Sequence, residues 1–320
     1  MTERTTGASP DSNHGRVADA TRRNWVDRFA PRPARPWLRL SRADRPAGTW
    51  LLLIPCWQSL ALAIAATGWR IEDLWFFLSM AIGAFLMRGA GCTWNDVTDR
   101  NFDGKVERTR SRPIPSGQVT ARGALVWMVV QALLAFLILI TFNPFAIALG
   151  VAALLPVAIY PFMKRVTWWP QIFLGIAFNW GALMGWAVHS HGLAPAPVLL
   201  YLAGIAWTLH YDTIYAHQDR EDDALIGVRS TARLFGAATG RWLVWFAALA
   251  VAGAGGAAAL ALSGPALAVA LAGVAAYGAH LAWQLLRLDI DDPDNCLRLF
   301  RANRDSGLIL LAGFLAAGFV

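Results

Sequence analysis

Charged side chains are scarce in this chain of 320 residues: Asp, Glu, Lys and Arg make up 15% of it, against about 25% in soluble proteins, while 56% is hydrophobic. The uncharged stretches are long, and a helix needs only about 20 apolar residues to cross a bilayer. Stretches without Asp, Glu, Lys or Arg cover residues 47–68, 123–143, 144–163, 242–263 and 265–286. An ordinary soluble domain is therefore excluded.

Cysteine is also rare, and its placement excludes further classes. Cys56, Cys92 and Cys296 are odd in number and far apart, and no Cys-x-x-Cys spacing occurs. A disulfide scaffold and a Cys-x-x-Cys zinc or redox site are excluded, and the three side chains are interpreted as small buried hydrophobes. No Gly-x-x-x-x-Gly-Lys loop is present, which argues against a nucleotide-driven machine.

The hydrophobic pattern predicts an all-α, polytopic membrane protein. We expect nine membrane helices near residues 47–68, 73–94, 122–142, 144–163, 168–189, 196–217, 241–263, 265–286 and 304–320. The last apolar run, from Leu308 to Val320, is short, so eight spans is the alternative. Residues 1–45 are polar and are predicted to form a disordered or membrane-surface tail, and residues 46–320 the transmembrane domain.

The basic residues orient these helices. Apart from Arg70 and Arg88, every Lys and Arg lies in the N-terminal tail or in alternate connections. The positive-inside rule places the tail and those connections in the cytoplasm. The net charge of +7 is then explained by a membrane surface rather than a nucleic-acid groove.

Acidic residues gather where the second and sixth helices reach this cytoplasmic side. If the second helix continues to Asp103, then Asn95, Asp99 and Asp103 share one face with Asp96 alongside, and Arg88 and Cys92 extend that face into the membrane. A charge at that depth is costly, so Arg88 should face a cavity and pair with an Asp or a ligand.

The second acidic stretch has a similar pattern. Asp212, Tyr215, Asp219 and Asp222/Asp223 would share one face of a continuous helix. Asp99 and Asp219 are 120 residues apart, and so are Asp103 and Asp223, as in an internally repeated bundle. Solvated helix ends with salt bridges are the simpler explanation for one such motif, but two motifs facing each other would need a cation, and an all-oxygen ligand set favours Mg²⁺ bound with a phosphate.

Basic residues accompany the acidic motifs. The segment 105–117 is rich in Lys and Arg, whose side chains match phosphate oxygens. Lys164 and Arg45 are expected at the same depth, either as ligands or as snorkelling anchors.

The motifs at 95–103, 112–117, 211–223 and 227–232 together resemble the UbiA superfamily of intramembrane prenyltransferases, and most closely its branch that prenylates 4-hydroxybenzoate in ubiquinone biosynthesis. The resemblance runs from about Arg39 into the last helix. It implies a nine-helix bundle around a central cavity, with transfer of a polyprenyl group from its diphosphate to the ring, ortho to the hydroxyl.

The resemblance also implies site roles. The catalytic carboxylates would be Asp99, Asp103, Asp219 and Asp223, and the magnesium–diphosphate positions Asn95, Asp96, Asp99, Asp103, Asp219, Asp222 and Asp223. Arg108, Arg112 and Lys164 would bind the diphosphate, and Arg45, Arg88, Asp212 and Tyr215 the aromatic acid.

Several alternatives stay open from the sequence. The acceptor could instead be a naphthoate, homogentisate, haem or chlorophyllide, and the chain could be a transporter that uses the acidic helix ends as an ion site. Acidic residues in the tail favour a bacterial inner membrane over the mitochondrial inner membrane, with the active site on the cytoplasmic side. No nucleic acid and no obligate protein partner are expected.

Overall fold

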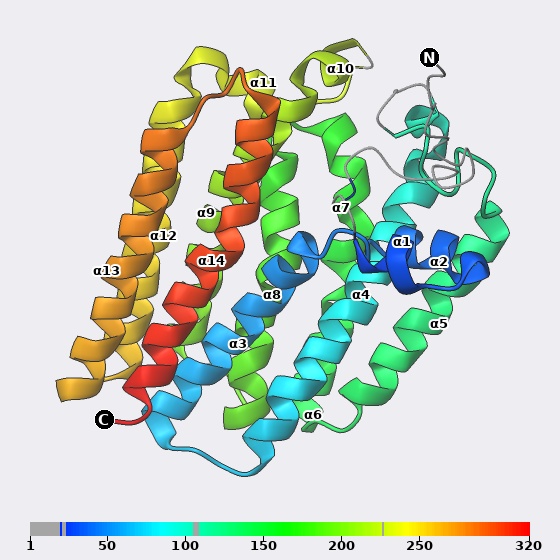
Figure 1. Ribbon diagram of the computed structural model, residues 1–320. Coiled ribbons are helices and arrows are strands. Elements are labelled where there is room, and N and C mark those ends of the chain that lie inside the picture. Colours follow the sequence, from blue (N-terminus) through cyan, green and yellow to red (C-terminus); the bar gives the residue numbers. More distant parts are fainter. Residues whose placement is uncertain (1–19, 21–23, 105–108, 226) are drawn as a thin grey trace, which may run out of the picture.

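The computed structural model describes residues 20, 24–104, 109–225 and 227–320, apart from the side chains of 101–103, 219 and 222. Long helices run side by side through the molecule (Figure 1). They are α3 (Ala47–Thr67), α4 (Glu72–Asp103), α5 (Ala121–Leu139), α6 (Pro144–Ala152), α7 (Leu154–Val166), α8 (Pro170–Ser190), α9 (Pro195–Ala216), α12 (Thr239–Ala261), α13 (Gly264–Arg287) and α14 (Pro293–Ala317). The fold is all-helical and polytopic.

Seven segments of the described chain are long and apolar enough to cross a membrane, two fewer than the nine predicted. The segments that fall short are α9 and α14. Helix α9 is enclosed between α8 and α12, so it can carry the buried polar residues Thr208, His210 and Thr213. Helix α14 begins with polar turns, and its Asn303 and Ser306 hydrogen-bond to Gln284 of α13. Hydropathy alone therefore undercounts helices whose polar groups have partners inside the bundle.

One predicted span is split. The helix expected at 144–163 is interrupted at Ala153, which separates α6 from α7. Pro156 has no N–H to donate to the carbonyl of Ala152, and its ring crowds that carbonyl, so the break falls where α6 ends.

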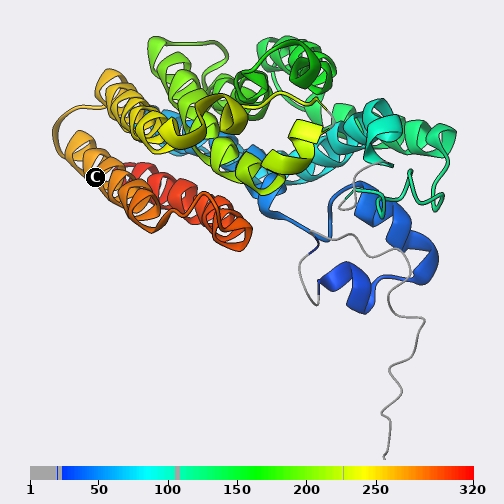
Figure 2. The ribbon, with the colours of Figure 1, turned by 90° about the horizontal axis from the view of Figure 1, so that it is seen from above.

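The bundle is organised around α3, which packs against α8, α14 and α4. Seen from above in Figure 2, α12, α13 and α14 lie on one side of the molecule and α4 and α5 on the other. Two glycines of α8 bring it close to α3: a Cβ on Gly181 would lie 2.3 Å from Cys56 Sγ, and one on Gly185 would lie 2.1 Å from the Cys56 carbonyl oxygen. These contacts fix the spacing of the two helices.

The segment before α3 is folded where it is described. Helices α1 (Trp25–Phe29) and α2 (Arg35–Leu40) pack on each other, and α2 contacts α4 and α5. Arg39 and Leu40 are buried, and Ser41 donates a hydrogen bond of 2.9 Å to Gln131 of α5. A disordered or surface tail to residue 45 was predicted, but residues 24–45 belong to the packed structure; residues 1–19 and 21–23 lie outside the description.

At the far end of the bundle, a buried hydrogen-bond cluster joins three helices. His189 at the end of α8 contacts Asp73 Oδ1 of α4 through Nδ1 and Thr67 Oγ1 of α3 through Nε2, each at 2.7 Å. Arg70 in the intervening loop donates to the His189 carbonyl oxygen at 2.6 Å. This cluster ties the helix ends together away from the acidic motifs.

Candidate active site

A cavity of about 470 Å³ runs along α4 between α3 and α5–α9. Met80 and Asn95 both line it, and their separation of 15 positions along α4 corresponds to about 22 Å of helix. Its polar end, called here the cavity mouth, is lined by Arg42, Arg45, Asn95, Arg112, Asp212 and Tyr215. Its deep part, called the apolar chamber, is lined by residues such as Leu52, Met80, Phe136, Phe142, Val157 and Met184.

Helix α4 brings the first acidic motif to the mouth. It continues to Asp103, as the sequence predicted conditionally, so Arg88, Cys92 and Asn95 follow one face and all line the cavity. Asp96 and Asp99 are buried beside that face, at 0% and 1% exposure, rather than in the lining. The side chain of Asp103 lies outside the description.

Each of the two described aspartates is held by two cations. Asp96 Oδ1 accepts from Arg42 Nη2 at 2.5 Å and from Arg112 Nη1 at 3.2 Å. Asp99 accepts from Lys164 and, at 3.0 Å, from Arg165. Buried carboxylates are stable only when they are paired in this way. The other oxygen of Asp96, Oδ2, is buried without a hydrogen-bond partner.

Arg42 is a site residue that the sequence interpretation missed. It lies in the cavity lining and makes the closest contact with Asp96, and its φ of 59° places the chain in a left-handed turn just before α3. Residue 42 fell inside the stretch predicted to be a tail, so its charge was not connected with the acidic motif. The Arg-x-x-Arg spacing of Arg42 and Arg45 was the available signal.

Arg45 and Asp44 complete the charged rim of the mouth. Burial lowers the pKa of Arg45 to about 10, and the charge of Arg112 adds to this effect. Arg45 Nε contacts Asp44 Oδ1 at 3.2 Å. Burial raises the pKa of Asp44 to about 6, an effect that the charge of Arg42 only partly opposes. The mouth therefore collects several guanidinium groups in a poorly solvated space, which favours an anion.

The second acidic motif departs from the predicted geometry. Helix α9 ends at Ala216, residues His217–Asp219 form a 3-10 turn and α10 (Arg220–Leu225) follows, so the α-helix expected to continue through Asp222/Asp223 is interrupted. The imidazole of His217 contacts Thr239 Oγ1 at 3.1 Å, which fixes this turn against α12. Asp212 and Tyr215, which precede the break, do reach the cavity lining together.

The remaining predicted residues are placed as follows. The Asp223 carbonyl oxygen accepts from Arg233 at 3.2 Å and from the Val228 N–H at 2.9 Å, so the loop after α10 is held in place. The side chains of Asp219 and Asp222 and the whole of Arg108 lie outside the description. The described residues contain no group of three or more His, Cys, Asp or Glu that could hold a metal.

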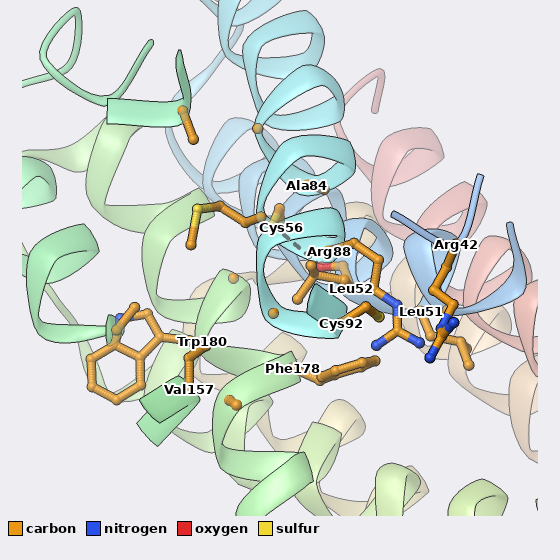
Figure 3. Close-up of a pocket in the computed structure, with 18 of the residues that line it drawn as sticks. Arg42, Leu51, Leu52, Cys56, Ala84, Arg88, Cys92, Val157, Phe178 and Trp180 are labelled. Atoms are coloured by element: carbon orange, nitrogen blue, oxygen red, sulfur yellow. Dashed lines mark hydrogen bonds between the residues drawn. The ribbon is translucent and has the colours of Figure 1, made fainter. Parts of the chain in front are cut away.

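Arg88 lies deeper in the lining than the other cations. Its guanidinium stands over the ring of Phe178 of α8, 5.1 Å from the ring centroid (Figure 3). Its Nε is buried without a hydrogen-bond partner, and none of the ion pairs among the described side chains involves it. Asp212 is the one carboxylate in the described lining.

The comparisons with known proteins agree with this arrangement. The model of the UbiA prenyltransferase family matches residues 52–306. The "4-hydroxybenzoate polyprenyltransferase, mitochondrial" of Rattus norvegicus is 47% identical over 98% of this chain and 84% of its own length, and that of Bos taurus is 48% identical over 89% and 76%.

Solved structures share the fold at lower identity. A UbiA homologue from Archaeoglobus fulgidus bound to GPP and Mg²⁺ aligns with a TM-score of 0.67 at 18% identity, covering 89% of this chain and all of its own. An apo UbiA homologue from Aeropyrum pernix K1 aligns with a TM-score of 0.63 at 24% identity, over 83% of this chain and 97% of its own.

Proposed function

This chain belongs to the UbiA prenyltransferase family, and on that premise we propose that it transfers a polyprenyl group from polyprenyl diphosphate to 4-hydroxybenzoate, as a step of ubiquinone biosynthesis. The observation that carries the proposal is the 47% identity to a 4-hydroxybenzoate polyprenyltransferase over 98% of the chain. The protein is a multi-pass membrane enzyme. Its cavity has the two parts that the reaction needs, a cationic mouth and an apolar chamber.

The two ends of the donor match these two parts. A polyprenyl chain is apolar and favours the chamber lined by Met80, Phe136 and Phe142, because contact there removes its surface from water. The diphosphate is an anion and favours the mouth, and we assign as its ligands Arg112 of the lining and Lys164, which is not in the lining but pairs with the adjacent Asp99. Arg108 is proposed for the same role from its motif alone.

The oxygen groups of the first motif fit Mg²⁺. Asn95 faces the cavity, and Asp96 Oδ2 is a buried carboxylate oxygen without a partner, as a position awaiting a cation would be. We propose that Asn95, Asp96 and Asp99, with the motif residues Asp103, Asp219, Asp222 and Asp223, hold the ion together with the diphosphate. A bound Mg²⁺ supplies positive charge that neutralises the diphosphate leaving group.

Binding of the donor would also exchange partners at the mouth. Arg112 and Lys164 now pair with Asp96 and Asp99. When the diphosphate takes these cations, each carboxylate keeps only one of its two partners, Arg42 or Arg165, and can accept a cation in place of the other. Donor and Mg²⁺ are therefore expected to bind cooperatively.

The reaction itself requires a protected carbocation. The bond between the allylic carbon and the diphosphate oxygen breaks, and the bonding electrons leave with the diphosphate while the cations of the mouth stabilise its charge. The apolar chamber keeps water from the allylic cation. The ring carbon ortho to the phenol oxygen then forms the new C–C bond, and that carbon loses its proton to a base, either the released diphosphate or a carboxylate such as Asp212.

The acceptor needs a cation for its carboxylate. We propose that Arg88 binds this carboxylate, with Arg45, Asp212 and Tyr215 around the ring. The support is that Arg88 lies in the cavity with a buried, unpartnered Nε, whereas Arg42 and Arg112 are engaged with Asp96. A guanidinium can donate two parallel hydrogen bonds to a carboxylate. A benzoate is therefore favoured as the prenyl acceptor over an uncharged compound.

The relatives also bear on the membrane in which the enzyme works. The rat and bovine proteins are named as mitochondrial, which favours the mitochondrial inner membrane over the bacterial inner membrane predicted from the tail. We place the cavity mouth on the side of the membrane that carries the basic connections.

The proposal is tested by incubating the purified full-length protein with geranyl diphosphate, MgCl₂ and 4-hydroxybenzoate. We expect a prenylated acid and one diphosphate for each product molecule. Parallel reactions with 1,4-dihydroxy-2-naphthoate and homogentisate test the other acceptors, and a better rate with either would reassign the substrate. Uptake of a substrate into vesicles without its consumption would support a transporter and overturn the proposal.

A further inference from the structure

Three helices meet at the guanidinium of Arg88. Arg88 extends from α4, the ring centroid of Phe178 of α8 lies 5.1 Å from its Cζ, and Gly48, in the first turn of α3, lies directly against the guanidinium. Figure 3 shows the guanidinium above the Phe178 ring, inside the cavity. An aromatic face and bare backbone are therefore in direct contact with the guanidinium, while the charge of Asp212, also in the lining, acts on it from a greater distance.

These surroundings differ from those of the cations that pair with the first acidic motif. Arg42 and Arg112 are oriented by Asp96, and Lys164 and Arg165 by Asp99. None of the ion pairs found among the described residues orients Arg88, and its buried Nε has no hydrogen-bond partner. Asp212 acts on Arg88 through its charge but forms no ion pair with it among the described side chains, so a group in direct contact is needed to orient the guanidinium.

Phe178 can do so through its ring. A cation over an aromatic face is attracted by the ring quadrupole, and the attraction is stronger where water is excluded. The ring leaves the edge of the guanidinium, with its N–H groups, unengaged. An acidic side chain in the same place would hold Arg88 more tightly but would occupy those N–H groups.

Gly48 provides the space. A Cβ at this position would lie 2.5 Å from Arg88 Nη2 and 2.8 Å from its Cζ, so any side chain would displace the guanidinium. Gly48 lies within helix α3 and not at a turn. Glycine is therefore needed here for the space that it leaves to the guanidinium and not for its backbone freedom.

The close packing of α3 on α8 fixes the positions of Phe178 and Gly48 relative to each other. Gly181, one turn after Phe178, lies against Cys56 of α3, where a Cβ would come within 2.3 Å of Sγ. The ring of Phe178 and the backbone at Gly48 thus belong to two helices whose separation is fixed.

We infer that Phe178 and Gly48 are positioning residues that hold the Arg88 guanidinium ready for a carboxylate, and so set the preference for a benzoate acceptor. This inference rests on the proposed function. It predicts a selectivity effect: losing either residue lowers the use of a charged acceptor more than that of its neutral analogue.

The test compares 4-hydroxybenzoate with 4-hydroxybenzamide, which has the same ring and hydroxyl but no charge. In Phe178→Leu, the ratio of kcat/KM for the acid to that for the amide should fall about tenfold, through a higher KM for the acid, while the KM for geranyl diphosphate is unchanged. Phe178→Tyr keeps the ring face and should keep the ratio. Phe314→Leu, a fully buried substitution in α14 outside the cavity lining, controls for a general loss of packing.

Gly48→Ala tests the contact between Gly48 and Arg88. Alanine is favoured over glycine within a helix, so the variant should fold, yet its methyl group displaces the guanidinium and the same ratio should fall about tenfold. Gly240→Ala is the matched control, because a Cβ there meets nothing within 4 Å.

Phe178→Leu should add no further change to the ratio of kcat/KM for the acid to that for the amide in an Arg88→Met background.

The outcomes separate the inference from the function on which it rests. An unchanged ratio in both Phe178→Leu and Gly48→Ala, with active wild-type enzyme, would overturn the inference alone. An equal fall for acid and amide would do the same, since it indicates only structural damage. Absence of any prenylated product from the wild type would overturn the proposed function and the inference with it.

Discussion

Asp96 and Asp99 lie within one turn of α4, and each accepts hydrogen bonds from two cationic side chains. Sequence spacing predicted that these carboxylates and several basic residues would lie near the same membrane face. It did not predict which would pair, because a linear pattern does not say how the segment before α3 folds back onto α4. Arg42, which contacts Asp96 most closely, was missed for that reason.

Removing the charge of Asp99 tests its proposed role. In Asp99→Asn, we expect kcat/KM to fall by about 100-fold or more, because the diphosphate–Mg²⁺ unit loses a ligand, and we expect added MgCl₂ to restore part of the activity. Steady-state rates across a range of MgCl₂ concentrations provide the measurement.

Asp73→Asn is the matched control for this variant. Asp73 is also a fully buried aspartate of α4, but it pairs with His189 at the far end of the bundle. It should lose thermal stability and keep its dependence on MgCl₂. The role assigned to Asp99 would be wrong if the two variants behaved alike.

Asp44 should make stability depend on pH. Burial raises its pKa from an ordinary 3.8 to about 6, so the folded protein holds this proton more tightly than the unfolded chain. The stabilisation is complete below about pH 4 and is lost as the pH rises through about 6. Thermal unfolding in detergent micelles at several pH values should show this decline in the wild type and a flatter profile in Asp44→Asn. Identical profiles would mean that Asp44 does not titrate in this range.

At the scale of helices, the sequence predicted most of the bundle, and the continuation of α4 through the first acidic motif, which it raised only as a condition, is present. The predictions failed where tertiary contacts decide. Helix α9 changes at Ala216 to a 3-10 turn in which His217 contacts Thr239, and no local sequence pattern predicted that contact. Within the helix expected at 144–163, Pro156 indicated a disturbance. The sequence could not say which kind, because a proline in a membrane helix can either kink the helix or split it.

The contact between α3 and α8 is the element-scale feature most sensitive to a single atom. A Cβ on Gly185 would lie 2.1 Å from the Cys56 carbonyl oxygen and 2.8 Å from the Leu60 nitrogen, both backbone atoms that cannot rotate away. We expect Gly185→Ala to destabilise the protein by about 1–3 kcal/mol, measured by thermal unfolding in micelles.

Gly255→Ala serves as the comparison, because its nearest neighbour would be an ordinary contact at 3.7 Å. If both alanine variants unfolded at the wild-type temperature, α8 could not pack on α3 as closely as described.

At the scale of the whole molecule, charge and hydrophobicity are separated along one cavity. Basic residues gather at the mouth, and the chamber beyond is apolar over much of the length of α4. The scarcity of charge in the sequence indicated the membrane, and the clustering of the few buried charges indicated the site. The shape of the cavity, however, depends on how α3–α9 pack, which no single segment encodes.

The central claim is that this chain forms a carbon–carbon bond between a prenyl group and the ring of 4-hydroxybenzoate. The most direct measurement is mass spectrometry of the product made by the purified full-length protein from geranyl diphosphate, MgCl₂ and 4-hydroxybenzoate deuterated at every ring position. The account predicts a product that has gained one geranyl group and lost one deuteron from a carbon ortho to the hydroxyl, with one diphosphate released. A product that retains all its ring deuterium, as an ether or ester would, or no product at all, would contradict it.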